Sequence, residues 1–89
     1  MTESQLQAKI IKYLEAQGWY VIKVVSSNRR GVPDLVCTKE SEYYFFEIKT
    51  PTGKAQPIQI AQINTINKIA SSERAFIVRS IEDVAQIIF

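Results

Sequence analysis

Eighty-nine residues, of which 46% are hydrophobic and 22% charged, have the size and composition of one small domain, and we expect residues 1–89 to form it. No apolar run reaches the roughly 18 residues of a membrane span, and the N-terminus lacks a signal-peptide pattern, so we expect a cytoplasmic protein with no membrane partner. A net charge of +2 is too small to indicate nucleic-acid binding, and one cysteine excludes an internal disulfide and a zinc knuckle.

The chain has no histidine. This absence excludes nuclease mechanisms with a histidine base, zinc sites with histidine ligands, and Ser-His or Cys-His nucleophile pairs. If the protein is a hydrolase, carboxylates, lysine and hard metal ions must carry the chemistry.

The first half of the chain predicts one helix followed by three strands. Residues 3–17 repeat apolar side chains at helical spacing, with Thr2 as the N-cap and Gly18 at the C-terminal end. Three segments rich in aromatic and β-branched residues predict strands, at 19–25, 34–38 and 43–49. A basic loop over 26–31 separates the first two strands, and a turn over 39–42 separates the last two.

The second half predicts a long helix, a strand and a short final helix. Residues 56–70 form the long helix, whose apolar stripe consists of Ile60, Ile63, Ile66 (or Asn67) and Ala70. A strand follows at 75–79, and Ser80 begins a capping-box pattern for a helix that runs to Ile88. The order αβββαβα predicts an α/β domain with a mixed central sheet flanked by helices.

The most informative pattern joins Asp34, Glu47 and Lys49. If the turn consists of Glu40 and Ser41, paired positions on the hairpin sum to 81, and Asp34 lies opposite Glu47 with Cβ atoms about 4.5–5.5 Å apart. Because side chains alternate along a strand, Lys49 shares a face with Glu47, about 7 Å further on. Two adjacent carboxylates repel each other unless a cation lies between them. An ammonium group beside them suggests that the bound cation has an anion as its partner. Metal-dependent cleavage of a phosphodiester requires this combination.

The same alternation predicts that Phe46 and Ile48 belong to the core, while Tyr43 and Phe45 floor the cleft. The alternative is a surface hairpin with an ordinary lysine, although two like charges directly opposite each other destabilise a sheet. Four basic residues flank the acidic pair and are candidates for phosphate contacts, or else solvated loop residues: Lys23, Arg29, Arg30 and Lys54.

Three segments together resemble one nuclease family: Gly31-Val32-Pro33-Asp34-Leu35, Phe46-Glu47-Ile48-Lys49 and Gly53-Lys54-Ala55-Gln56-Pro57-Ile58-Gln59. They resemble the virus-type replication-repair nuclease (VRR-NUC) domain, a branch of the PD-(D/E)xK nuclease superfamily. The resemblance covers essentially the whole chain. The chain looks like one of the minimal, stand-alone members of the family, which are found in bacteriophages. It implies a restriction-endonuclease-like core.

The resemblance also implies roles for single residues. Asp34 and Glu47 would bind the metal ion together with the backbone carbonyl of Ile48, and Lys49 would be the active-site lysine. Gln59 matches a helix-borne glutamine that faces the cleft. Glu3 matches an N-terminal acidic residue that binds a second metal ion, although an acid in a first helical turn also suits the helix dipole. Gln7 is a weaker candidate for the same cleft.

The implied activity is Mg²⁺- or Mn²⁺-dependent hydrolysis of phosphodiester bonds in branched DNA, by a homodimer similar to Holliday-junction resolvases, with no small-molecule cofactor. Residues 84–89 are apolar enough either to join such a dimer or only to cover the sheet. If a phage encodes the protein, it would act in the host cytoplasm. The alternatives are a monomeric nuclease for flaps or single strands and an inactive DNA-binding module, against which the intact Asp34, Glu47 and Lys49 argue. A restriction or anti-restriction role ranks last, because the chain is small for reading a base sequence.

Overall fold

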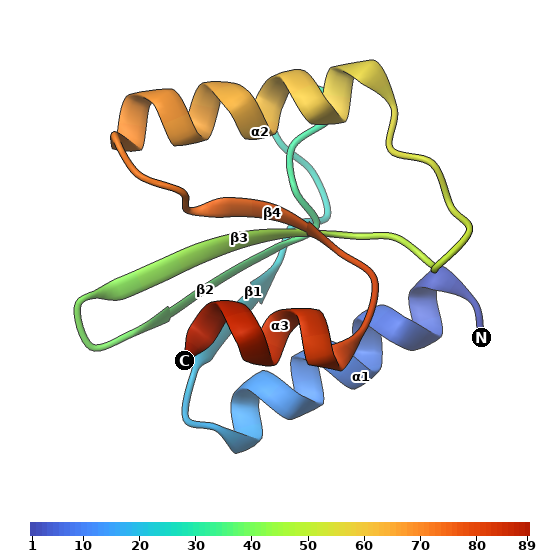
Figure 1. Ribbon diagram of the computed structural model, residues 1–89, viewed down its shortest axis with the longest axis vertical. Helices are drawn as coiled ribbons and strands as arrows, with labels where there is room; N and C mark the ends of the chain where they lie inside the picture. The colour runs from blue at the N-terminus through green and yellow to red at the C-terminus, as the bar shows by residue number, and fades with distance from the viewer.

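The computed structural model describes residues 1–89 as a four-stranded sheet with one helix on one face and two helices on the other (Figure 1). The elements in chain order are α1 (Glu3–Ala16), β1 (Tyr20–Lys23), β2 (Leu35–Lys39), β3 (Glu42–Ile48), α2 (Pro57–Ala70), β4 (Ala75–Val78) and α3 (Ile81–Ile88). The predicted order and the mixed sheet are confirmed. None of the helices combines the length and the apolar character that crossing a membrane demands.

The sheet has the order β1-β2-β3-β4, in which the first three strands are antiparallel and β4 lies parallel to β3. The parallel pair needs a long crossover, which α2 provides. On the hairpin, Lys39 pairs with Glu42 and Leu35 with Phe46. The two-residue turn and the predicted register, in which paired positions sum to 81, are therefore confirmed.

Local signals in the sequence explain where the helices begin and end. The Thr2 hydroxyl accepts a hydrogen bond from the Gln5 N–H at 3.1 Å, and the Thr2 N–H donates to Gln5 Oε1 at 2.8 Å, which is a complete capping box. Gly18 follows α1 with a φ of +91°, a conformation that favours glycine. The Ser80 hydroxyl accepts from the Asp83 N–H at the start of α3.

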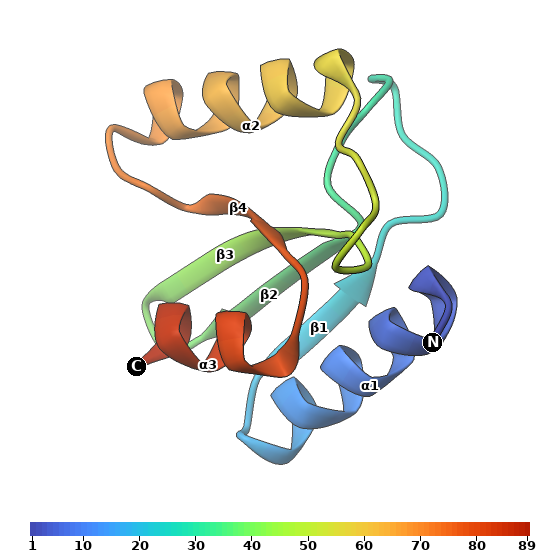
Figure 2. The same cartoon turned by 45° about the vertical axis from the view of Figure 1, so that its right-hand side comes forward.

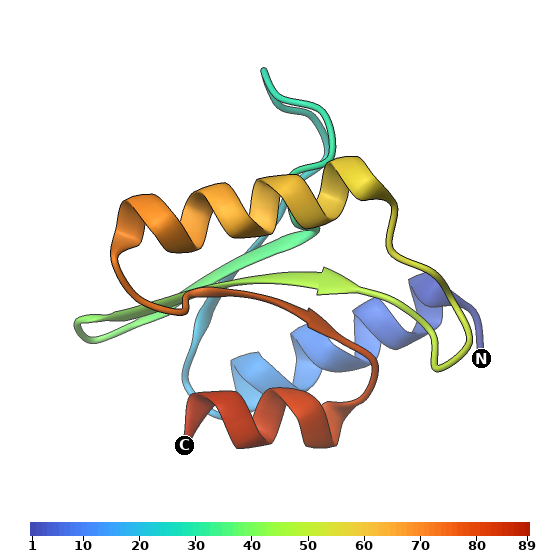
Figure 3. The same cartoon turned by 45° about the horizontal axis from the view of Figure 1, so that its top comes forward.

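The core lies between the sheet and the pair α1 and α3 (Figure 3). Its buried residues are Leu6, Ile10, Leu14, Trp19, Leu35, Cys37, Phe46, Ile48, Val78 and Val84. Phe46 and Ile48 are fully buried, as predicted. In α3, Val84 is buried and Ile87 and Ile88 pack against the same cluster, so this segment covers the sheet, while Phe89 is 93% exposed.

The opposite face of the sheet is covered less completely, by α2 alone. Only Ile63 of this helix is buried, and Ile60 is 44% exposed. The predicted burial of the stripe is therefore wrong at Ile60, and Ile66 and Ala70 are only half-buried. The physical reason is that α2 packs along the edge strand β4, where a narrow line of its side chains meets the sheet.

The connection between β1 and β2 extends past the first turns of α2 (Figure 2). The Gln62 side chain donates to the Arg30 carbonyl at 2.9 Å and ties this connection to the helix. Gly31 has a φ of +75°, and a Cβ at this position would lie 2.8 Å from the Ile58 side chain. The glycine before Val32-Pro33-Asp34 thus permits the close approach of the connection to α2.

Candidate active site

The start of β2 and the end of β3 bring Asp34 and Glu47 together. Asp34 lies one residue before β2 and Glu47 one residue before the end of β3, so they continue the hairpin register by one step. The Ile48 N–H donates to Asp34 Oδ2 at 2.9 Å, and the Val24 N–H donates to the Asp34 carbonyl at 2.8 Å. The Asp34 side chain is thereby held at the edge where the ladder ends.

Three carboxylates converge at this point. Oxygen atoms of Glu3, Asp34 and Glu47 all lie within 4.8 Å of one another. They come from the first turn of α1, the start of β2 and the end of β3, and Glu3 is exposed whereas Glu47 is only 1% exposed. The structure therefore places the N-terminal acid beside a pair that is 31 or more residues away in the chain.

Lys49 lies next to this cluster. Its Nζ is 3.4 Å from Glu47 Oε2 and 3.8 Å from Glu3 Oε2, and the residue is buried. The side chain emerges on the same face of the sheet as Glu47, as the alternation along β3 predicted. A buried ammonium needs anionic partners, and these two carboxylates provide them.

Gln59 connects α2 to the cluster. Its Nε2 donates to Glu47 Oε2 at 3.0 Å, while its Oε1 accepts from the Gln56 N–H at 2.8 Å. The second bond belongs to the capping box of α2, so it decides which end of the amide faces inward. The start of the helix thus orients a donor toward Glu47.

The Glu47 carboxyl is buried and its charge is only partly compensated. Burial raises the pKa of this carboxyl to about 7, and the nearby Asp34 adds to the rise, while Lys49 opposes it. Glu47 Oε1 is buried and has no hydrogen-bond partner. An unpaired buried carboxylate oxygen is costly, and a bound ion would satisfy it. The donors are hard oxygen atoms, so the residues present fit Mg²⁺ or Mn²⁺.

The other predicted site residues lie outside this cluster. The four basic candidates are exposed and form no ion pair: Lys23, Arg29, Arg30 and Lys54. Gln7 is half-buried on α1 and makes no hydrogen bond to the carboxylates. Tyr43 and Phe45 line a separate hollow of about 490 Å³ under α2, which includes none of the three acids. These rings therefore do not floor the acidic cleft itself.

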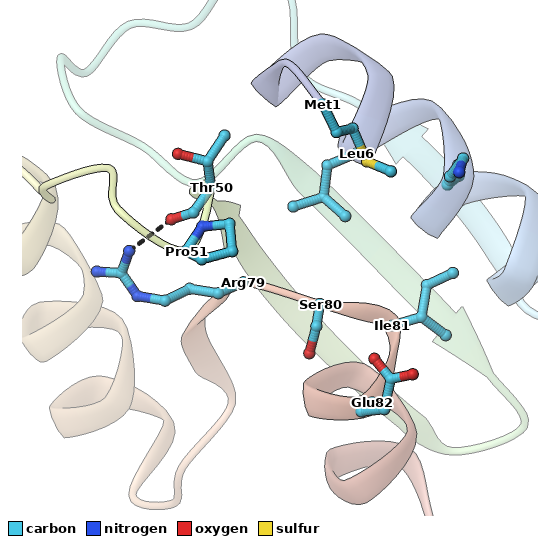
Figure 4. A pocket seen from close by; sticks show the side chains of 9 residues that line it. Met1, Leu6, Thr50, Pro51, Arg79, Ser80, Ile81 and Glu82 are labelled. Carbon is cyan, nitrogen blue, oxygen red and sulfur yellow. Dashed lines mark hydrogen bonds between the residues drawn. The ribbon is translucent and has the colours of Figure 1, made fainter.

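Arg79 is a residue that the sequence did not indicate. Its guanidinium donates to the Thr50 carbonyl oxygen at 2.7 Å (Figure 4). It also donates to the Gly53 carbonyl oxygen. These carbonyls belong to the turn between Lys49 and α2, so Arg79 holds the connection that joins two parts of the cluster. The parallel pairing of β3 and β4 brings Arg79 next to the turn that follows Lys49. No local sequence motif predicts such a contact. The hollow beside it, about 300 Å³, is lined by none of the three acids of the cluster.

The sequence model of the family described as archaeal Holliday junction resolvase (Hjc) matches residues 4–82. The chain belongs to this family. A solved structure described as a VRR_NUC domain has a TM-score of 0.78 and 26% identity and covers 97% of this chain and 92% of its own. Another, a VRR_NUC domain protein, has a TM-score of 0.79 and 20% identity over 99% of this chain and 85% of its own.

The Hjc of Archaeoglobus fulgidus, described as a Holliday junction resolvase from an archaeal hyperthermophile, has a TM-score of 0.66 to this Hjc-family chain. The two share 17% identity over 86% of this chain and 67% of the other, so this likeness concerns the fold. No curated protein matches the sequence. The resemblance to the VRR-NUC domain and the PD-(D/E)xK fold are confirmed, and the family and its fold neighbours point to a nuclease.

Proposed function

We propose that this Hjc-family protein is a Mg²⁺- or Mn²⁺-dependent endonuclease that hydrolyses phosphodiester bonds in branched DNA as a homodimer. The observation that carries the proposal is the convergence of Glu3, Asp34 and Glu47 within 4.8 Å beside the buried Lys49. The unpaired Glu47 Oε1 supports a cation at this point. Membership of the resolvase family supports branched DNA as the substrate.

Asp34, Glu47 and the Ile48 carbonyl would hold the metal ion, and Glu3 would contribute to a second one. In the extended hairpin register, the position opposite Ile48 is Pro33, which has no N–H to offer to that carbonyl. Proline before the aspartate thus leaves a backbone oxygen available at the edge of the cluster. When bound, the ion polarises the scissile phosphate and lowers the pKa of a bound water.

The protein's own groups then have separate tasks. Lys49, which lies 3.4 Å from Glu47, would offset the negative charge that develops on the phosphate during hydrolysis. Gln59 holds Glu47 Oε2 through its amide and leaves Oε1 for the ion. Asp34 is oriented by the Ile48 N–H. We expect the product to carry a 5′-phosphate.

Binding of DNA would depend on the four exposed basic residues that the sequence indicated: Lys23, Arg29, Arg30 and Lys54. Such residues contact phosphates, which provides affinity without reading the base sequence. A protein of this kind selects the shape of its substrate. A four-way junction is resolved by two cuts, and a homodimer would place one active site at each.

The test is cleavage of three labelled substrates, a four-way junction, a flap and a single strand, with Mg²⁺, Mn²⁺ or EDTA. We expect paired symmetric nicks in the junction that require the metal ion. Preferred cutting of the flap by a monomer would favour the nuclease alternative of the same family. Binding of DNA without any cutting, and no uptake of Mn²⁺ in calorimetry, would leave only an inactive DNA-binding module.

A further inference from the structure

The chain between β3 and α2 has little structure of its own. Residues 50–55 form one backbone hydrogen bond, from the Gly53 N–H to the Thr50 carbonyl at 3.1 Å, and none of them is buried. The sheet fixes the chain as far as Lys49, whose N–H donates to the Val78 carbonyl at 3.0 Å. Beyond that point, a contact from elsewhere in the molecule must determine the path to α2.

Arg79 makes this contact. Its Nη1 donates to both the Thr50 and the Gly53 carbonyl oxygens, the first at 2.7 Å. No other side chain forms a hydrogen bond with residues 50–55. Two carbonyl oxygens that share one donor nitrogen lie close together and repel each other, and the positive guanidinium offsets that repulsion. Arg79 thus favours this tight turn over other paths of the chain.

The backbone of Arg79 is held by the start of α3. The Arg79 N–H donates to Asp83 Oδ2 at 2.8 Å, and the Asp83 N–H donates to the Ser80 hydroxyl at 3.1 Å. Helix α3 belongs to the core through the buried Val84. Arg79 forms no ion pair, so no carboxylate competes with the two carbonyls for its guanidinium. The well-packed side of the sheet therefore determines the turn that leads to α2.

The two ends of α2 are anchored differently. At the C-terminal end, the Asn67 Oδ1 accepts two backbone N–H groups at the entry to β4, each at 2.8 Å. The first turn carries Gln59, which donates to Glu47 Oε2 at 3.0 Å, but it has no buried side chain. In the second turn, the bond from Gln62 to the Arg30 carbonyl leads only to an exposed loop. The position of the Gln59 amide therefore depends on the turn that precedes the helix.

We propose that Arg79 is a positioning residue of the active site: by fixing the turn before α2, it sets the Gln59 amide against Glu47. The inference rests on the proposed function, in which Glu47 is a metal ligand. Arg79 forms no hydrogen bond or ion pair with the three acids, so it acts through the turn and not on the metal ion directly. Because the turn lies outside the core, loss of the guanidinium should weaken metal binding without unfolding the protein.

Two substitutions of Arg79 separate this role from general stabilisation. Arg79→Met keeps an unbranched, flexible side chain and removes the donors, whereas Arg79→Lys keeps a positive nitrogen that can donate to two acceptors. The matched control is Arg74→Met. Arg74 lies just before β4 as Arg79 lies just after it, and it also donates to a carbonyl, that of Tyr43 at 3.5 Å.

The first measurement is amide hydrogen exchange by NMR, in EDTA and without DNA. The Gln56 N–H reports on the turn, because it donates to Gln59 Oε1 at 2.8 Å. We expect Arg79→Met to speed its exchange by about 10-fold or more and to leave the Ile10 N–H in the core as in wild type. Arg79→Lys and Arg74→Met should both keep the exchange of the Gln56 N–H close to the wild-type rate.

The second measurement is calorimetric titration with Mn²⁺ in a double-mutant cycle. We expect Arg79→Met to weaken Mn²⁺ binding by about 5- to 10-fold, and Arg79→Lys to restore most of the affinity. In the Gln59→Ala background, Arg79→Met should add little, because the amide that Arg79 positions is already absent. A residue of general stability would lower the affinity by the same factor in both backgrounds.

A folded Arg79→Met protein with unchanged Gln56 exchange and unchanged Mn²⁺ affinity would overturn the proposal. Failure to fold, equally faster exchange at Ile10, no rescue by Arg79→Lys, or full additivity with Gln59→Ala would overturn it as well. Weaker binding of DNA with both readouts unchanged would make Arg79 a phosphate contact, with the same consequence. If the exchange results hold but wild type neither binds Mn²⁺ nor cuts DNA, the proposed function alone fails.

Discussion

The two long helices, α1 and α2, have 14 residues each and lie on opposite faces of the sheet, but they are built differently. Helix α1 buries three side chains and exposes its charged residues, Glu3, Lys9, Lys12 and Glu15. Helix α2 buries one side chain and has one charged residue. The difference teaches that α1 stabilises the fold through a buried apolar face, whereas α2 contributes little burial and leaves most of its surface exposed.

Both helices nevertheless touch the same cluster with their first turns. From α1, Glu3 Oε2 lies 3.8 Å from Lys49 Nζ. From α2, Gln59 Nε2 lies 3.0 Å from Glu47 Oε2. The site therefore joins a firmly packed layer to a loosely packed one. Each of the following variants tests this contrast, beginning with the largest expected effect.

Removing the charged side chains of the cluster, which lies at the first turns of both helices, should have the largest effect on the rate of DNA cutting. We expect Asp34→Ala, Glu47→Ala and Lys49→Ala each to lower metal-dependent cutting by at least about 10²–10³-fold, because each loses a ligand or a charge at the developing transition state. The measurement is the single-turnover rate on a four-way junction. Glu73→Ala, at an exposed acid away from the cluster, is the control and should cut normally. Wild-type-like cutting by a pure Lys49→Ala preparation would remove this assignment.

Truncation of the two helices should separate their roles in stability. Ile10 is fully buried in α1, so we expect Ile10→Ala to cost about 2–5 kcal/mol of unfolding free energy. Ile60→Ala in α2, at a 44% exposed residue, should change it by about 0.5 kcal/mol or less. Urea unfolding at one protein concentration provides the comparison. Equal losses would contradict the difference between the helices.

The pH dependence of stability should report on Glu47. Its pKa is raised from 4.5 to about 7 in the folded protein, so the folded state holds this proton more tightly than the unfolded chain. The resulting stabilisation is complete below pH 4.5 and is lost as the pH rises through about 7. The loss amounts to at most about 3 kcal/mol.

Thermal unfolding in EDTA, from about pH 5 to about pH 8, measures this effect as the difference between wild type and Glu47→Gln. The variant should lose less stability over this range and be the more stable protein at the upper end. Added Mg²⁺ should stabilise wild type more at high pH than at low pH, because it competes with the proton. The same slope in both proteins would show that Glu47 is not the titrating group.

Loss of the Gln59 amide should have a smaller effect on the site than loss of Asp34, Glu47 or Lys49. We expect Gln59→Ala to weaken Mn²⁺ binding by about 10-fold, because the variant releases Glu47, the metal ligand that we propose. The measurement is calorimetric titration with Mn²⁺, with Asn64→Ala, at an exposed position of the same helix, as the control. Unchanged affinity in Gln59→Ala would indicate that the first turn of α2 does not position Glu47.

Several features of the fold follow from short-range patterns alone. The capping signals at Thr2 and Ser80 mark the starts of α1 and α3, and the turn at Glu40 and Ser41 sets the hairpin register. That register brings Asp34 and Glu47 together, because a two-residue turn and strict alternation leave little freedom. The core and metal-binding candidates on β3 could therefore be assigned from sequence.

Other features depend on contacts between distant segments. The place of Glu3 beside Lys49 and the contact of Arg79 with the Thr50 turn require the packing of α1 and β4, which no local pattern encodes. The apolar stripe of α2 was predicted to be buried, but Ile60 is exposed because the helix lies over an edge strand. A periodic pattern identifies the apolar side of a helix but not what covers it.

By itself, the sequence determined the order of the elements, the hairpin register and the pairing of two acids, since each depends on neighbours within a few residues or across one tight turn. Only the tertiary structure decided that α1 buries its apolar side chains against the sheet and that α2 leaves most of its own exposed. Burial is a property of the whole packed molecule, where α1 and α3 share one face of the sheet while α2 alone faces the other.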